Sequence, residues 1–137
     1  MRTNVRFKSN RFKQPENKDE PFAGKELAEW LIEKIGSDFK LDYIDEDYYC
    51  ILYLGEPANK KIEGACGHVE KNTWQVLMKL NPNFLDRLLK RPLPKDFLES
   101  FLLAFDSVLH DDSEISEIEW YEEGLKLQEM NYGEHPV

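Results

Sequence analysis

The sequence has little cysteine and no long apolar run. It holds two cysteines in 137 residues, Cys50 and Cys66, so no disulfide framework is implied, and we expect a cytoplasmic protein. No apolar stretch approaches the roughly 20 residues of a membrane-spanning helix, and no apolar segment follows the basic residues of the N-terminus as in an export signal. We therefore expect a soluble chain without a membrane partner.

Motifs for phosphate, calcium and nucleic acid are also missing. The seven glycines are spread along the chain, and no glycine-rich loop ending in Gly-Lys-Ser or Gly-Lys-Thr is present. No acidic stretch has the ligand spacing of an EF-hand calcium loop. The 27 acidic and 18 basic residues leave a formal charge of -9, which disfavours nucleic acid because a polyanion requires a clustered basic surface.

What the chain does have is enough apolar and aromatic content for one core. Hydrophobic residues make up 41% and aromatic residues 12%, which is too much for a disordered chain. The length suits a single domain, residues 1–137, that buries a core without a structural metal. Within it we distinguish a basic N-terminal strand, or arm, and loop at residues 1–21 and a C-terminal tail at residues 122–137.

Hydrophobic periodicity predicts two main helices. Between Gly24 and Gly36 apolar residues recur at helical spacing, and we expect Gly36 to end this helix, because glycine adopts the left-handed conformation of a helix end most easily. A wide apolar stripe from Lys95 to His110 predicts a long core helix. A short helix after Asn81 is also expected.

Alternating apolar and polar residues predict the strands. The clearest strand contains Trp74, Val76 and Met78, which share one face. The predicted strands are residues 4–12 as an edge strand, 39–44, 48–54, 62–69, 73–80 and 115–121. Because short connections make neighbouring strands antiparallel, we predict an α+β fold, an antiparallel sheet of about five to six strands with two main helices packed on one face, as a two-layer sandwich.

Cysteine and histidine are the first candidates for chemistry. Cys66 and His68 stand two residues apart on a predicted strand, about 7 Å from each other, which is long for a Cys–His catalytic pair. A zinc site usually contains a close cysteine pair, which is absent, and His110 and His135 would join a site only if the fold brought them together. We therefore expect no enzyme, no metal and no cofactor. A small metal or thiol protein using Cys50, Cys66 and His68 stays an alternative.

Charge is distributed unevenly along the chain. Residues 1–13 contain five basic and no acidic residues, whereas residues 99–137 contain eleven acidic residues and one basic residue. In the last predicted strand Glu117 and Glu119 alternate with apolar residues, so both carboxylates would face solvent beside Tyr121. Such a surface would steer a basic protein partner, although acidity also serves solubility alone.

Several segments together resemble a group of small bacterial single-domain proteins. They are Gly24-x-x-Leu27-Ala28-x-Trp30-Leu31, Glu46-Asp47-Tyr48-Tyr49 before an apolar strand, Trp74-x-Val76, and Ile115-x-x-Ile118-x-Trp120-Tyr121. The group has Trp-Gly where this chain has Tyr48-Tyr49. The likeness covers about residues 20–121 and concerns core positions, so it implies the fold and no activity.

In size, acidity and α+β character the chain also resembles immunity proteins of bacterial polymorphic toxin and contact-dependent inhibition systems. That resemblance implies binding to a cognate toxin domain, often a basic nuclease, and blocking of its active site or substrate surface.

These features favour an immunity-like protein-binding module without catalysis that neutralises a basic toxin domain through an acidic surface. An acidic secretion chaperone or adaptor, which would bind an extended segment in an apolar groove, is the alternative. The oligomeric state and the role of the basic arm are left open. The candidate partner-binding residues are Asp45, Glu46, Asp47, Tyr48, Tyr49, Asp111, Asp112, Glu117, Glu119, Tyr121, Glu122 and Glu123.

Overall fold

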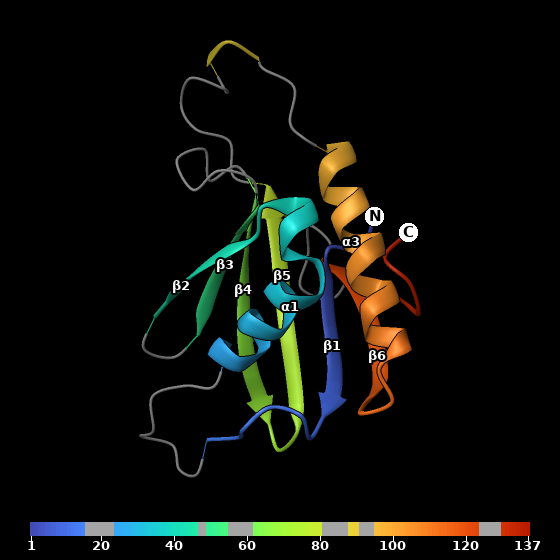
Figure 1. Ribbon diagram of the computed structural model, residues 1–137. Helices are drawn as coiled ribbons and strands as arrows, with labels where there is room; N and C mark the ends of the chain where they lie inside the picture. Colours follow the sequence, from blue (N-terminus) through green and yellow to red (C-terminus); the bar gives the residue numbers. More distant parts are fainter. Residues whose placement is uncertain (16–23, 47–48, 55–61, 81–87, 91–94, 124–129) are drawn as a thin grey trace.

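A seven-stranded antiparallel sheet with two helices on one face makes up the part of the chain that the computed structural model describes. The described residues are 1–15, 24–46, 49–54, 62–80, 88–90, 95–123 and 130–137 (Figure 1). The predicted α+β class is confirmed, with one or two strands more than expected. The predicted short helix after Asn81 falls mostly outside the described residues.

The sheet is a long meander extended by strands from both ends of the chain. Its strand order is β2-β3-β4-β5-β1-β6-β7, and every neighbouring pair is antiparallel. The strands are β1 (Asn4–Ser9), β2 (Asp42–Asp45), β3 (Cys50–Leu54), β4 (Ile62–Glu70), β5 (Thr73–Leu80), β6 (Ile115–Glu123) and β7 (Met130–Gly133). The helices are α1 (Gly24–Phe39) and α3 (Lys95–Asp111).

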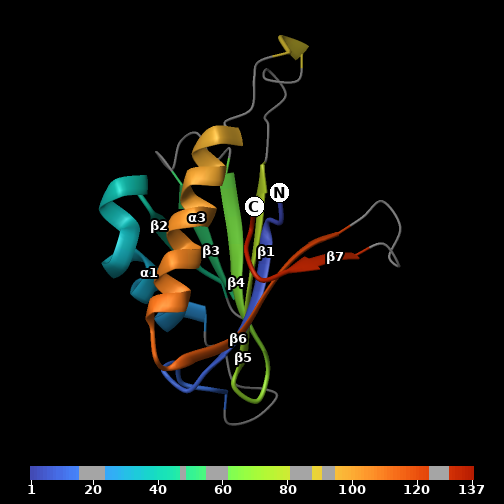
Figure 2. The ribbon, with the colours of Figure 1, turned by 90° about the vertical axis from the view of Figure 1, so that its right-hand side faces the viewer.

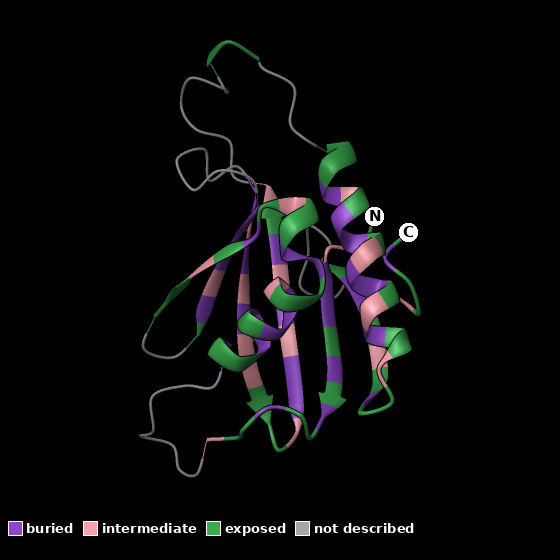
Figure 3. Cartoon of the chain, in the orientation of Figure 1, coloured by how far each residue is buried: buried purple, intermediate pink, exposed green. Residues whose placement is uncertain are grey.

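The core lies between the two helices and the sheet face that they cover. Figure 2 shows α1 and α3 on the same side of the sheet. Trp74, Trp120, Phe101 and Phe105 are fully buried there, and the rings of Phe105 and Trp120 meet edge to face with centroids 5.8 Å apart. Buried positions alternate along the strands in Figure 3, as the period of two requires. No helix of the described residues covers the opposite face, which is called the open face below.

β1 lies in the interior of the sheet, so the prediction of an edge strand is wrong. Val5 is opposite Val76 of β5 and Trp120 of β6, and its side chain has no exposed surface. Arg6 and Lys8 alternate with the buried residues and are exposed. The alternation of Arg6 and Lys8 with buried residues shows that one face of the strand is open to solvent, and it does not distinguish an edge strand from an interior one.

Helix α1 continues one turn beyond Gly36, which corrects its predicted end. Phe39 packs its ring edge to face on Phe101 of α3, with centroids 5.5 Å apart, so the last turn contributes to the core. Lys40 then adopts a left-handed φ of 47°, and the Leu41 N–H donates to the Gly36 carbonyl at 2.9 Å. With Leu41 buried, this is the Schellman arrangement, in which an apolar contact accompanies the left-handed residue.

The predicted C-terminal tail contributes a strand. Gly133 of β7 is opposite Trp120 of β6, and beyond it the Arg2 N–H donates to the Pro136 carbonyl at 2.6 Å. A strand of four residues is too short to be predicted from alternating apolar and polar residues. Backbone pairing with β6 holds these residues in the strand conformation. Neither helix in the described part of the chain has the length and apolar character needed to cross a bilayer.

Candidate functional site

The predicted partner-binding residues fall into two groups on different parts of the sheet. Asp45, Glu46 and Tyr49 lie where β2 connects to β3. The other group follows the end of α3 and runs along β6, and β4, β5 and β1 lie between the two groups (Figure 1). One continuous acidic strand surface is therefore not formed. Asp47 and Tyr48 fall outside the described residues, as does the side chain of Glu123.

The connection between β2 and β3 is represented among the described residues by Asp45, Glu46 and Tyr49, which are called the acidic turn below and present two carboxylates and an aromatic ring. The Glu46 N–H donates to the Tyr49 carbonyl at 2.9 Å, and Asp45 is opposite Cys50 in the strand register. The thiol of Cys50 lies 3.4 Å from Asp45 Oδ1 as a donor. Asp45 and Glu46 are exposed, and Tyr49 is 42% exposed. The turn thus carries its charge and its ring at the surface.

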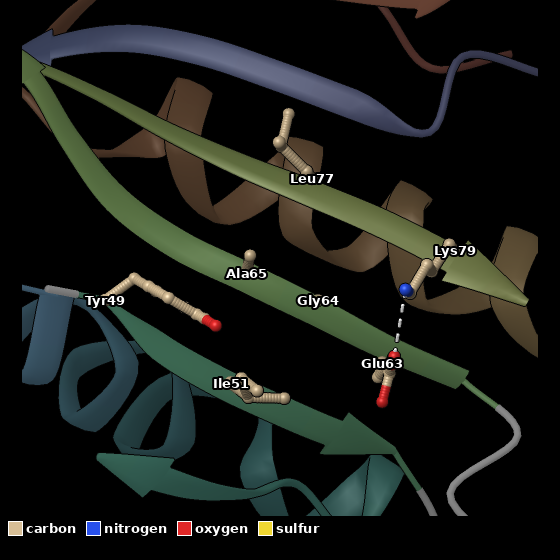
Figure 4. Close-up of a pocket in the computed structure, with 7 residues that line it drawn as sticks. All are labelled: Tyr49, Ile51, Glu63, Gly64, Ala65, Leu77 and Lys79. Carbon is tan, nitrogen blue, oxygen red and sulfur yellow. Dashed lines mark ion pairs between the residues drawn. The ribbon is translucent and has the colours of Figure 1, made fainter. Parts of the chain in front are cut away.

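A hollow of about 320 Å³ adjoins the acidic turn on the open face. Figure 4 shows the side chains of Tyr49, Ile51, Ala65 and Leu77 around it, with the helices behind the sheet. Ile51, Ala65 and Leu77 are half-buried, because they belong to the face that the helices leave uncovered. The hollow has an apolar floor since Ala65 is small and its neighbours on β3 and β5 are aliphatic.

One end of this hollow is charged. Glu63 of β4 and Lys79 of β5 are directly opposite each other, and their side chains form an ion pair of 3.2 Å (Figure 4). Opposite charges facing each other across two strands stabilise the pairing modestly. The hollow therefore has an aromatic wall at Tyr49, an apolar floor and a polar rim.

Part of the acidic group at the end of α3 and along β6 is paired with the basic N-terminal arm. Lys8 Nζ lies 2.7 Å from Glu117 Oε2. Arg11 reaches both Asp112, at 2.8 Å, and Glu114, at 2.9 Å. These contacts follow from the position of β1 beside β6, which places Lys8 and, just beyond β1, Arg11 next to the acidic segment. The charge asymmetry of the sequence is thus partly neutralised within the fold.

Tyr121 is buried and does not serve as an exposed aromatic. Only 4% of the surface of this residue is exposed to solvent, and its hydroxyl lies 3.4 Å from Gln75 Oε1. The guanidinium of Arg6 stands 5.8 Å from the centre of its ring, within cation–π range. Arg6 is also opposite Glu119 in the strand register. Among the described members of this group, Asp111, Glu117, Glu119 and Glu122 are exposed.

Asp112 shows how the arm changes the electrostatics of the acidic segment. Burial pushes the pKa of Asp112 upward, but hydrogen bonds from Arg11 and from the Glu114 N–H, with the positive charge of Arg11, outweigh it. The net pKa lies below its ordinary value. Asp112 is therefore ionised and neutralised by a cation of the same chain over the whole physiological range.

The cysteines lie together in the core, and burial suppresses their reactivity. Cys50 and Cys66 are directly opposite on β3 and β4, and both are free and buried. Burial and the neighbouring carboxylate of Asp45 raise the pKa of Cys50 to about 12, and burial raises the pKa of Cys66 well above its ordinary value. His68 is half-buried, and its Nε2 lies 2.5 Å from the Lys71 carbonyl. Protonated thiols are poor nucleophiles and poor metal ligands at neutral pH.

A second cluster, absent from the predicted site residues, joins α3 to the C-terminal segment. It consists of Asp106, His110 and His135, whose ligand-type atoms all lie within 4.8 Å of one another. The spacing Asp106-x-x-x-His110 places two of them on one helix face, which the sequence does reveal. His135 reaches this helix face because β7 and the contacts of Arg2 position the C-terminal segment. No local sequence pattern indicates this placement.

No family model, curated protein or solved structure matches the chain. The resemblances described from the sequence stay predictions, and the case for a function comes from the geometry and the charges of the chain itself.

Proposed function

We propose that the chain is an immunity-like protein-binding module that binds a basic bacterial toxin domain on the open face of its sheet. The binding site is centred on the hollow beside Tyr49. The observation that carries this proposal is the meeting of three features in one place. An exposed ring at Tyr49 and a half-buried apolar floor at Ile51 and Leu77 line the hollow, and the exposed carboxylate of Glu46 belongs to the same turn as Tyr49. Asp45 adds charge at this turn on the face that carries Cys50.

These features correspond to the parts of a protein–protein interface. Interfaces place aromatic anchors at their centre, surround them with a polar rim, and draw much of their affinity from a few such anchors. Within the described residues neither Asp45 nor Glu46 forms an ion pair, and Asp45 accepts a hydrogen bond from the neutral Cys50 thiol, so no described cation of the chain neutralises these two carboxylates. The formal charge of -9 adds long-range attraction for a basic domain.

The partner is identified first by capture at two salt concentrations. Tagged full-length chain should retain one basic protein from the source cells at low salt, and retention should weaken at about 0.5 M salt, where exposed charges are screened. A partner held equally well at both concentrations would contradict the electrostatic part of the proposal. It would favour the adaptor or secretion-chaperone alternative, whose apolar groove does not depend on charge.

Substitutions then locate the site. With the captured partner, the double variant Asp45→Lys with Glu46→Lys should associate about tenfold more slowly and with a flatter salt dependence. Tyr49→Ala should mainly accelerate dissociation and weaken binding by about 2 kcal/mol, as loss of a central aromatic does. Surface plasmon resonance measures both rates.

A matched control separates position from net charge. Glu33→Lys with Asp38→Lys changes the charge equally at exposed positions of α1, in the helical layer, and should leave most of the association rate intact. Equal slowing by the control would show that net charge alone acts. Loss of binding on Glu119→Lys with Glu122→Lys, with the acidic-turn variant unaffected, would instead move the site to β6.

A further inference from the structure

Asp106, His110 and His135 converge from two parts of the fold that are remote in sequence. Asp106 and His110 lie one turn apart on α3, with His110 Nε2 3.1 Å from Asp106 Oδ1. His135 follows β7, and its Nδ1 lies 2.8 Å from Asp106 Oδ2. The two imidazole rings stand 5.2 Å apart between their centroids. Asp106 is buried, whereas both histidines reach the surface.

The position of His135 is fixed by the N-terminus of the chain. Arg2 Nη1 donates to the His135 carbonyl at 2.9 Å, and the Arg2 backbone N–H donates to the Pro136 carbonyl at 2.6 Å. The guanidinium crosses Gly133 so closely that a Cβ there would lie 2.3 Å from Arg2 Cζ. The backbone of the segment is thereby held beside α3, and the imidazole of His135 is directed at Asp106.

Asp106 is held in turn by the core. The indole N–H of Trp120 donates to Asp106 Oδ1 at 2.7 Å, and Trp120 is completely buried. This bond fixes the carboxylate and leaves Oδ2 directed at His135. An outer hydrogen bond that orients a ligand carboxylate is a regular part of metal sites, and its loss usually weakens metal binding.

We propose that Asp106, His110 and His135 bind a divalent transition-metal ion, with Zn²⁺ as the best fit. Two imidazole nitrogens and one carboxylate oxygen are the donor set of open zinc sites, in which water occupies the remaining position. Ca²⁺ and Mg²⁺ prefer more ligands, all of them oxygen. This proposal departs from the expectation of no metal, which considered the histidines only as additions to a cysteine site.

The distances suit such an ion. Metal–ligand bonds of about 2.0 to 2.2 Å set neighbouring ligand atoms about 3 to 3.5 Å apart. Asp106 Oδ2 to His135 Nδ1 and Asp106 Oδ1 to His110 Nε2, at 2.8 and 3.1 Å, are close to this range, and small rotations of the exposed rings admit the ion. Each neutral imidazole then carries its ring proton on the nitrogen away from the metal, on His110 Nδ1 and His135 Nε2, while the facing nitrogens offer lone pairs.

Calorimetric titration of the full chain with ZnCl₂, after treatment with a chelator, tests the site. The unmodified chain should bind one Zn²⁺, and His110→Ala or His135→Ala should each weaken binding more than about tenfold. His68→Ala is the matched control, since it removes the third histidine of the chain at a remote position on β4. Binding that is unchanged in His110→Ala and His135→Ala, or equally weakened in His68→Ala, would overturn the proposal.

Cobalt spectroscopy distinguishes this site from the cysteines. Co²⁺ bound by nitrogen and oxygen should give visible d–d bands that disappear in His110→Ala and in Asp106→Asn, a substitution that preserves an acceptor for the Trp120 N–H. An intense thiolate charge-transfer band in the near ultraviolet would place the ion at Cys50 and Cys66 and contradict the assignment. Far-ultraviolet circular dichroism of each variant verifies its fold, and no partner protein is needed for either experiment.

Discussion

Arg11 is the residue that connects the basic arm most firmly to the acidic segment. Its guanidinium bonds to Asp112 and Glu114 in the turn between α3 and β6. Two carboxylates on one guanidinium form a small network, which stabilises a fold more than an isolated exposed pair. The side chain thereby fixes the loop that follows β1 to the end of α3.

The stability contributed by Arg11 should depend on pH. The folded pKa of Asp112 is lowered, so its contribution is present above the unfolded pKa of about 3.9 and is lost as the pH falls through the folded pKa. We expect Arg11→Ala to reduce the free energy of unfolding by about 1 kcal/mol at pH 7. The difference from the unmodified chain should shrink between about pH 4 and pH 2.

Urea unfolding at several pH values measures this difference. Lys8→Ala, which removes a cation from an exposed pair with Glu117, is the control and should have a smaller effect. A difference for Arg11→Ala that stays constant down to pH 2 would show that the side chain acts through packing instead of charge.

Helix α1 is followed by a lysine in a left-handed backbone conformation that glycine adopts more easily. Lys40 occupies the left-handed position where glycine is most common, because Phe39 and Leu41 are fixed by apolar contacts on either side. A lysine in this conformation is strained by about 1 kcal/mol relative to glycine.

Replacing Lys40 by glycine should therefore stabilise the protein. We expect Lys40→Gly to raise the free energy of unfolding by about 1 kcal/mol, measured by urea denaturation. Lys34→Gly, at an exposed interior position of the same helix, should lower it by about the same amount. Destabilisation by both substitutions would mean that the Lys40 side chain contributes contacts that outweigh its backbone strain.

The elements that sequence predicts well are those with local partners. Trp74, Val76 and Met78 alternate, and their neighbours on β4 are a short connection away, so the meander follows from periodicity. β7 has four residues and no apolar alternation. Its strand conformation depends on backbone pairing that exists only in the folded sheet. The ion pair of Glu117 with Lys8 could not be predicted from the sequence either, because it depends on a β-bulge in which Glu117 adopts a φ of 50°.

On the scale of the whole molecule, the two ends of the chain hold each other. Arg2→Ala should accelerate amide hydrogen exchange in residues 130–136, because the guanidinium anchors Asn131 and His135. Mass spectrometry of exchanged peptides measures the effect. Lys8→Ala, on β1, is the control and should leave that segment protected. Unchanged exchange in Arg2→Ala would mean that pairing with β6 alone holds β7.

The candidate sites illustrate which parts of function a sequence can predict. The exposure of Asp45, Glu46 and Tyr49 could be predicted because turn residues are exposed wherever the turn falls, while their role in binding stays a prediction. The split of the acidic residues into two groups, and the meeting of His135 with Asp106, depend on strand order. Strand order is set by contacts between segments that are far apart in the chain, which periodicity does not encode.

The interior position of β1 also has a consequence for how the chain reaches its native state. Its partners are β5, about 70 residues further along, and β6, more than 100 residues further along. Because pairing across such separations is slow, we expect β2 to β5 to assemble first and β1 to wait for β6. During synthesis on a ribosome, β1 would lack its second partner until β6 has been made. A chain that stops before Ile115 would leave β1 as an open edge, prone to aggregation.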